Sequence, residues 1–285
     1  MTRWVGWVLY LLWGLLCFLV FFHLFFPYES LGRRILHTLE QEAGLVSRPS
    51  ATRPQLLGIR WARVDLLLPH QKSLPPIGIR DWVIELSPLT LLVGRLSLSS
   101  HGSVMDGAFE ARLVSRRGGQ QGSMEWRNIR LDRFPLFLIE GKASLTGMTR
   151  GTVQWDTGEE RLNGKASFEI QNGKIHDIVL AGFSLPVLDL GQTRGQMSWK
   201  EGRLTLQEIN VAGDDVNATL TGDVLMKAPV AESQLACRVD VRLAPRLLDR
   251  YPVVKALYKG REDQAKPLSM IMGGTLKVPE ISFTP

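Results

Sequence analysis

The sequence predicts a mainly β fold, in which an N-terminal transmembrane helix precedes an elongated, curved antiparallel β-sheet with few short helices. Three observations predict this class. The chain opens with a long uncharged stretch, the remainder alternates apolar and polar residues with a period of two, and glycines divide that remainder at regular spacing. We expect a membrane anchor at residues 1–28, an amphipathic helix and linker at 29–54, and one β-rich domain at 55–285.

The stretch from Trp4 to Phe26 contains no Asp, Glu, Lys or Arg, so it can cross a membrane as a helix. A helix of this length spans roughly 35 Å, more than the ~30 Å hydrocarbon core of a bilayer. The expected anchor residues are Trp4 and Trp7 near one end, where tryptophan rings favour the headgroup level, and Phe26 at the other. Because the stretch ends in bulky Phe25-Phe26-Pro27-Tyr28, without the small residues of a cleavage site, we expect a retained anchor rather than a signal peptide.

Charge does not decide the orientation of this anchor. Arg3 precedes it, Arg33 and Arg34 follow it, and Glu29 lies between, so the two flanks are nearly balanced. The large domain after the helix favours translocation of the bulk of the chain, and the reverse orientation stays open. The formal net charge of +6 is modest and favours a slightly basic solvated surface, with no nucleic acid as partner.

Helical periodicity follows the anchor between Glu29 and Gly44. Leu31, Ile35, Leu36 and Leu39 recur at the three-to-four spacing of an amphipathic helix, and Gly44 suits its end. The segment 47–54 carries two prolines among serines and arginines, and it is typical of a linker.

Period-two alternation then predicts strands with one apolar and one polar face. It is clearest on both sides of Phe168, Leu220 and Val239, and a change of parity between Leu206 and Ile209 predicts a β-bulge near Glu208. The expected apolar face comprises these residues: Ala166, Phe168, Ile170, Val216, Leu220, Val239 and Val241. We also expect a late helix at 244–259, kinked at Pro252, and a final strand at 273–283, broken at Pro279.

The tetrapeptide Gly-Lys-Ala-Ser occurs twice, with its lysines at Lys142 and Lys165. A phosphate-binding loop would require a glycine five residues before the Gly-Lys pair and a hydroxyl directly after the lysine. Both copies lack both features, since Ala143 and Ala166 follow the lysines. The motif is better explained as the start of two equivalent strands.

No constellation of catalytic or metal-binding residues stands out. His37, His70, His101 and His176 are scattered singly, and the two cysteines lie far apart in the sequence. The acidic pairs 159–160 and 214–215 adjoin glycines between strands, which favours turns over acid–base catalysis. We therefore expect a non-enzymatic protein with no catalytic residues, no cofactor and no metal site.

Three stretches carry a resemblance to a known family. FPYESLGRRI after the anchor, LGQTRGQMSWKEGRLTLQEINVAGDDVNATLTGDVLM, and RLAPRLLDRYPVVKAL followed by GGTLKVPEI resemble the bacterial type II secretion system protein N family. The chain is also similar to the wider AsmA-like proteins, which share an N-terminal anchor and a long β-sheet. The resemblance implies a single-pass protein of the bacterial inner membrane with its bulk in the periplasm. It also implies membrane lipids and other secretion-system envelope proteins as partners, and no catalytic residues.

Two functions are favoured by the sequence, and an envelope enzyme is a third hypothesis that no site in the sequence supports. The first is a non-enzymatic accessory component of a type II protein secretion system, whose β-domain docks to the apparatus. The second is an AsmA-like lipid-binding or lipid-transfer module, in which the seven apolar residues above line a concave groove. Periodicity alone does not separate such a groove from the core of a closed sandwich.

Overall fold

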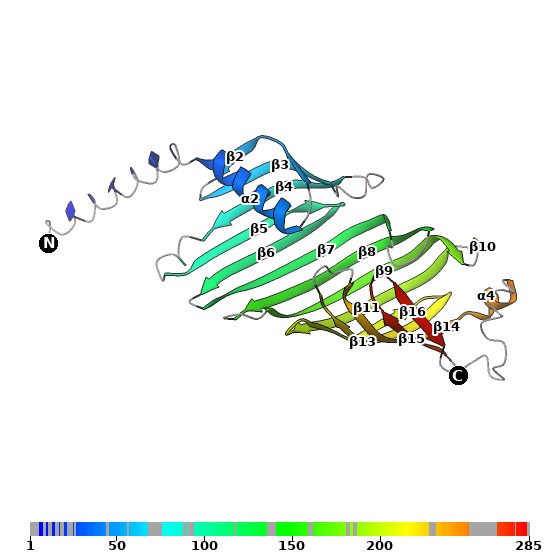
Figure 1. Cartoon of the computed structure of the whole chain (residues 1–285). Coiled ribbons are helices and arrows are strands. Elements are labelled where there is room, and N and C mark those ends of the chain that lie inside the picture. The colour runs from blue at the N-terminus through cyan, green and yellow to red at the C-terminus, as the bar shows by residue number, and fades with distance from the viewer. Residues whose placement is uncertain are drawn as a thin grey trace. The chain divides into compact units, whose positions relative to one another are not determined.

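The computed structural model forms two compact units, Met1–Val104 and Met105–Pro285 (Figure 1). The sequence predicts a single β-rich domain at 55–285 and does not indicate a division at residue 104. The structure describes isolated positions within the first 26 residues and the following ranges: 27–43, 46–55, 57–67, 76–87, 90, 94–116, 118–135, 141–158, 162–180, 183–184, 187–227, 232–250, 267–276 and 278–283.

The prediction of a mainly β, antiparallel protein is confirmed. Among the described residues, no helix combines the length and the apolar character needed to cross a membrane. Of the expected anchor residues, Trp4 and Phe26 lie outside the described residues, and Trp7 is described as exposed in a helical backbone.

Unit 1 pairs an amphipathic helix with an antiparallel sheet (Figure 1). Helix α2, Tyr28–Ala43, confirms the predicted helix and begins with Glu29 in its first turn, where a carboxylate favours the helix dipole. The strands are β1 Val46–Pro49, β2 Thr52–Gln55, β3 Gly58–Leu67, β4 Ile77–Leu86 and β5 Leu96–Val104. Their order is β1-β3-β4-β5, with β2 also paired to β3.

The core of unit 1 lies between α2 and this sheet. Trp61 on β3 is fully buried, and its ring lies against that of Trp82 on β4, with 5.1 Å between the centroids. A Cβ atom on Gly32 of α2 would lie 3.1 Å from the Trp61 ring, so glycine at this position lets the helix approach the indole closely. The buried Leu36 is a further apolar contribution of the helix.

The predicted linker at 47–54 is wrong in part, because it contains β1 and β2. Both strands pair antiparallel with β3, at the edge of the sheet. Pro49 and Pro54 fit edge strands, where a missing backbone donor is tolerated. Prolines that punctuate a linker and prolines at a sheet edge look alike in the sequence.

Unit 2 is a succession of antiparallel strands that follow one another in the sheet, and Figure 1 shows this sheet curving toward its C-terminal strands. The order is β6-β7-β8-β9-β11-β12-β13-β14-β15-β16, with β10 paired to β9. The bounds are β6 Gly107–Arg116, β7 Gly119–Pro135, β8 Gly141–Thr157, β9 Leu162–Leu180, β10 Phe183–Ser184, β11 Leu188–Lys200, β12 Arg203–Ala212, β13 Val216–Leu225, β14 Gln234–Leu243, β15 Leu268–Gly274 and β16 Pro279–Phe283.

Register shifts between the strands of unit 2 determine which side chains lie on each face of the sheet. The predicted bulge near Glu208 is confirmed, because β12 and β13 pair through Leu206 and Ile209 with a register shift between them. Two further register shifts in β7–β8 and β8–β9 lie beside Asn128 and Asn172, which have φ of 55° and 53°. Asparagine tolerates this left-handed conformation better than most residues.

The C-terminal region differs from the prediction. Helix α4, Pro245–Arg250, covers only the start of the expected helix, and residues 251–266, including Pro252, lie outside the described residues. The expected broken final strand is a pair of strands, β15 and β16, in which Pro279 begins β16 instead of interrupting it. Proline is tolerated at the first residue of an edge strand, which explains the difference.

Candidate functional site

Unit 2 presents an apolar face, defined by four rows of residues that lie opposite one another across neighbouring strands. Paired residues of a sheet share a face, so each row stays on one side. The rows are Trp126-Gly151-Phe168-Gly195-Ile209-Leu220-Val239-Met270, Met124-Val153-Ala166-Met197-Leu206-Gly222-Cys237-Met272, Ile129-Thr149-Ile170-Thr193-Val211-Ala218-Val241-Leu268, and Gly122-Trp155-Gly164-Trp199-Leu204-Val224-Leu235.

Two of these rows alternate aromatic residues with glycines. A Cβ atom on Gly164 would lie 2.2 Å from the Trp199 ring, and one on Gly195 would lie 2.3 Å from the Phe168 ring. The same relation holds between Gly151 and Trp126, at 2.4 Å. The aromatic rings therefore lie flat over glycines of neighbouring strands, which gives a smooth apolar surface.

All seven residues predicted to line an apolar groove lie on this face. Six are members of the rows, and Val216 precedes Ala218 by two positions on β13, which keeps it on the same side. Val216 is buried, whereas Ala166, Phe168, Ile170, Leu220, Val239 and Val241 are half-buried. Their role as a groove stays a prediction.

The apolar face remains partly exposed over the middle strands. Along β8 the residues of the apolar face, such as Val153 and Trp155, are half-buried, while the intervening polar residues are exposed. Toward the C-terminal strands the same face contains the buried Val224, Cys237 and Leu268. Burial also raises the pKa of the Cys237 thiol, as expected for an apolar surrounding.

A hollow of about 810 Å³ adjoins one end of the apolar face. Its walls come from the ends of β9, β11 and β12, from the turn between β11 and β12, and from Met226 just after β13. The lining side chains are mainly large and apolar: Leu162, Met197, Trp199, Leu204 and Met226, together with Glu201. A ligand that covered this region would remove mostly apolar surface from water.

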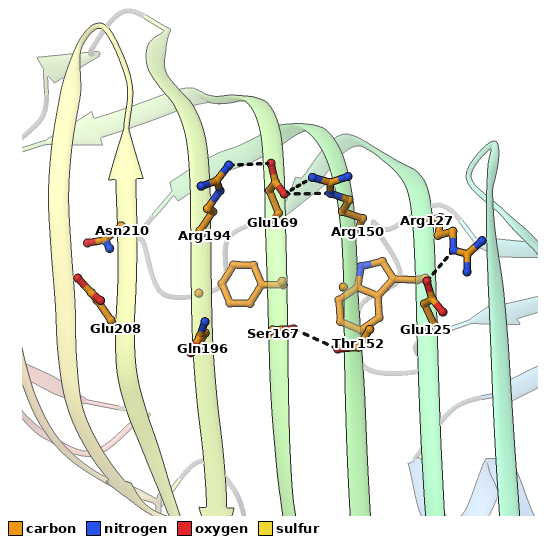
Figure 2. Close-up of a pocket in the computed structure, with 14 residues that line it drawn as sticks. Glu125, Arg127, Arg150, Thr152, Ser167, Glu169, Arg194, Gln196, Glu208 and Asn210 are labelled. Carbon is orange, nitrogen blue, oxygen red and sulfur yellow. Dashed lines mark hydrogen bonds and ion pairs between the residues drawn. The ribbon is translucent and has the colours of Figure 1, made fainter.

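The opposite face of the same strands is polar and carries cross-strand ion pairs. Figure 2 shows Glu169 on β9 between Arg150 on β8 and Arg194 on β11, and a separate pair of Glu125 with Arg127 on β7. These residues line a hollow of about 550 Å³.

Glu169 is the centre of this polar cluster. Arg150 donates to its carboxylate through Nε at 2.9 Å and through a second nitrogen at 2.6 Å, and Gln171 and Gln192 also donate to it. The hydrogen bonds from Arg150, followed by those from Gln192 and Gln171, lower the pKa of Glu169 to about 2. A carboxylate that accepts this many bonds has its acceptor sites occupied, so it suits a structural role better than proton transfer.

Asp215 connects three elements through its side chain. The sequence predicts only that this residue lies in a turn. It lies between β12 and β13, and its carboxylate accepts hydrogen bonds from the Arg246 guanidinium at 2.8 Å and from the Asp189 backbone at 2.8 Å. The side chain is 11% exposed. This one residue links the start of β11, the turn before β13 and helix α4.

The remaining candidates from the sequence are not brought together. His176 contacts Thr146, with 3.0 Å between His176 Nε2 and Thr146 Oγ1, while His37 lies on α2 and His101 on β5. His70 and residues 159–160 lie outside the described residues. Gly141 begins β8 and Gly164 lies near the start of β9, so both Gly-Lys-Ala-Ser copies lie at strand starts, as predicted.

The sequence prediction missed the tryptophans of the apolar face. Trp126, Trp155 and Trp199 obey the same alternation as their apolar neighbours, and glycines recur at matching distances in the adjacent strands. The matching spacing of tryptophans and glycines in adjacent strands was the feature of the sequence that could have predicted this arrangement.

Comparison of the chain with protein-family models, with curated proteins and with solved structures gives no match.

Proposed function

We propose that this chain is a non-enzymatic, membrane-anchored protein of the bacterial envelope whose unit 2 holds the acyl chains of lipids along its apolar face. In this proposal residues 4–26 anchor the chain in the inner membrane and the units lie in the periplasm. An anchor followed by a long sheet is the arrangement that the resemblance to AsmA-like proteins implies, and the long antiparallel sheet of unit 2 supports the proposal. The function is that of a lipid-binding or lipid-transfer module.

The observation that supports this function best is the continuity of the apolar face. Apolar residues and glycines follow one another across neighbouring strands from β7 to β15, and most of the large apolar side chains of the middle strands, such as Trp155, Phe168 and Trp199, are only half-buried. Each methylene group that such a surface removes from water contributes about 0.8 kcal/mol. The flat rings over glycines leave few projections, which suits extended, unbranched acyl chains.

Leu220 allows a direct test, because it lies within one row, between Ile209 and Val239, and its sequence neighbour Thr221 points to the opposite face. Glutamate in place of Leu220 would introduce a charge that an acyl chain cannot solvate, whereas glutamate in place of Thr221 would lie opposite Arg238. The full chain is extracted in mild detergent and its bound phospholipid is measured by native mass spectrometry. We expect Leu220→Glu to lower bound phospholipid by about fivefold or more and Thr221→Glu to leave it unchanged.

A wild-type protein without bound phospholipid would contradict the proposal, and so would equal lipid content in the two variants. Thermal unfolding of both variants controls for a general loss of structure.

A second candidate function is that of an accessory component of a type II secretion system. It is supported by the three stretches that resemble the protein N family. Two of them contact each other, since Asp215 in the Gly-Asp-Asp turn pairs with Arg246 in the closing helix, at 2.6 Å. The two functions are compatible, because a lipid-binding module can serve within a secretion apparatus.

A further inference from the structure

Helix α2 lies against the sheet of unit 1 (Figure 1). Residues of the helix and of the strands line an apolar cavity of about 330 Å³. The helix contributes Tyr28, Leu31 and Ile35, and the strands contribute residues that include Ile84 and Leu98. Apart from the phenol of Tyr28, the described side chains that line the cavity are apolar. A lining of this character offers water no polar partners and favours an apolar ligand.

Leu57, which also lines the cavity, has an unusual backbone conformation. Its φ of 59° lies in the left-handed region, which is costly for a leucine. Its carbonyl accepts a hydrogen bond from the Leu86 backbone at 2.9 Å, which holds this turn between β2 and β3 in place. Strained residues persist where the surrounding structure determines them, and they concentrate at ligand sites.

The cavity is open at its rim. Leu31 on α2 is 38% exposed and Leu96 on β5 is 43% exposed, although both line the cavity. Two large apolar side chains thus mark an entrance that leads from solvent, or from a membrane surface, to an apolar interior.

The position of α2 in the chain indicates the occupant. The helix begins at Tyr28, two residues after the end of the anchor proposed above, so it would lie at the surface of the bilayer. Arg33 and Arg34 are exposed within its first two turns. Arg34 follows Leu31 by three positions, which places it on the neighbouring part of the helix surface, where a guanidinium can meet a lipid phosphate.

We propose that this cavity binds one acyl chain of a phospholipid from the membrane in which the chain is anchored. The proposal rests on the membrane anchoring stated under Proposed function, but not on lipid binding by the apolar face of unit 2. The two sites lie in different units and are tested separately.

The test uses the full chain in vesicles of phosphatidylethanolamine and phosphatidylglycerol, in which one acyl chain of the former carries a photoactivatable diazirine. After irradiation, modified peptides are identified by mass spectrometry. We expect adducts on peptides that contain Leu57 and Leu98. Leu96→Trp should fill the entrance and lower these adducts by about fivefold or more. Val46→Trp is the matched control, because Val46 in the same unit is equally exposed at 43% and does not line the cavity.

Absence of adducts on the Leu57 and Leu98 peptides of the wild-type protein would overturn the proposal, whatever the stability of the variants. Equal labelling of these peptides in Leu96→Trp and Val46→Trp would also overturn it. Such a result would show that the lipid contacts the surface of unit 1 and does not enter the cavity. Labelling by a diazirine-bearing free fatty acid but not by the phospholipid would exclude a phospholipid as the ligand. Peptides of β9 and β13 in the same digest report on unit 2, so adducts there without adducts in unit 1 would contradict only this inference.

Discussion

Glu169 shows how the polar face of unit 2 is held in register. Its carboxylate lies on the central strand of three, and Arg150 and Arg194 reach it from the two neighbouring strands. Cross-strand pairs of opposite charge are a common means of stabilising a sheet. Because the same strands have an apolar opposite face, any slip by one residue would move these charges onto that apolar face.

The lowered pKa of Glu169 predicts a pH dependence of stability. The folded-state pKa of about 2 lies below the ordinary value of 4.5, so ionised Glu169 stabilises the folded protein above about pH 4.5. This contribution is lost as the pH falls from there toward 2. In thermal unfolding from pH 7 to pH 2, we expect the difference in Tm between wild type and Glu169→Gln to be largest at neutral pH and to shrink below pH 4.5.

Glu208→Gln is the matched control, since Glu208 is exposed in the same hollow. Its Tm should follow that of the wild type over the whole pH range. If the Tm of Glu169→Gln falls with pH as steeply as that of the wild type, ionisation of Glu169 does not contribute to the loss of stability at low pH.

At the scale of the strand, aromatic rings pack against glycines of the neighbouring strands. The indole of Trp199 lies over Gly164, and a Cβ at that position would also lie 2.5 Å from the Gln154 carbonyl oxygen. Any side chain at Gly164 must therefore displace the ring or separate two strands. Gly164 belongs to the second Gly-Lys-Ala-Ser copy, so the glycine of that copy serves the packing of this row.

Substitution of Gly164 by valine should destabilise unit 2 by about 1–3 kcal/mol, the usual cost of overpacking. The control is Gly158→Val, because no heavy atom lies within 4 Å of a Cβ built there, and we expect a change within about 0.5 kcal/mol. Chemical denaturation followed by near-ultraviolet circular dichroism measures both the free energy of unfolding and the packing of the indole. Equal stability of the two variants would contradict the aromatic–glycine arrangement.

The sequence predicts the strands well where alternation is strict, and poorly where a proline or a positive φ intervenes. Residues 166–170 and 216–226 show uninterrupted parity, and the face assigned to them agrees with the strand register. The bulge near Glu208 was visible because the apolar parity itself changes there. Those beside Asn128 and Asn172 were not, because a single asparagine is a weak indication of a left-handed residue. Pairing between strands, which brings each ring onto a glycine, is a long-range property that alternation does not contain.

At the scale of the whole molecule, each unit leaves apolar surface accessible in a different way. Unit 1 has a cavity beneath α2, and unit 2 has a long half-buried face. Monomeric soluble proteins seldom expose large contiguous apolar patches without a binding function. The anchor proposed for residues 4–26 would supply a lipid surface close to the first of them.

The two candidate functions of the whole protein can be separated in cells by deletion and complementation. We expect deletion of the gene to lower export of proteins that leave through the outer-membrane secretin, and the Thr221→Glu chain to restore it. The Leu220→Glu chain should not restore export, because a carboxylate on the apolar face opposes binding of an acyl chain. Membrane fractionation and immunoblotting would establish that both variants reach the inner membrane in equal amounts. Export unaffected by the deletion would contradict the role in secretion, while restoration by both variants would show that the apolar face is not used for export.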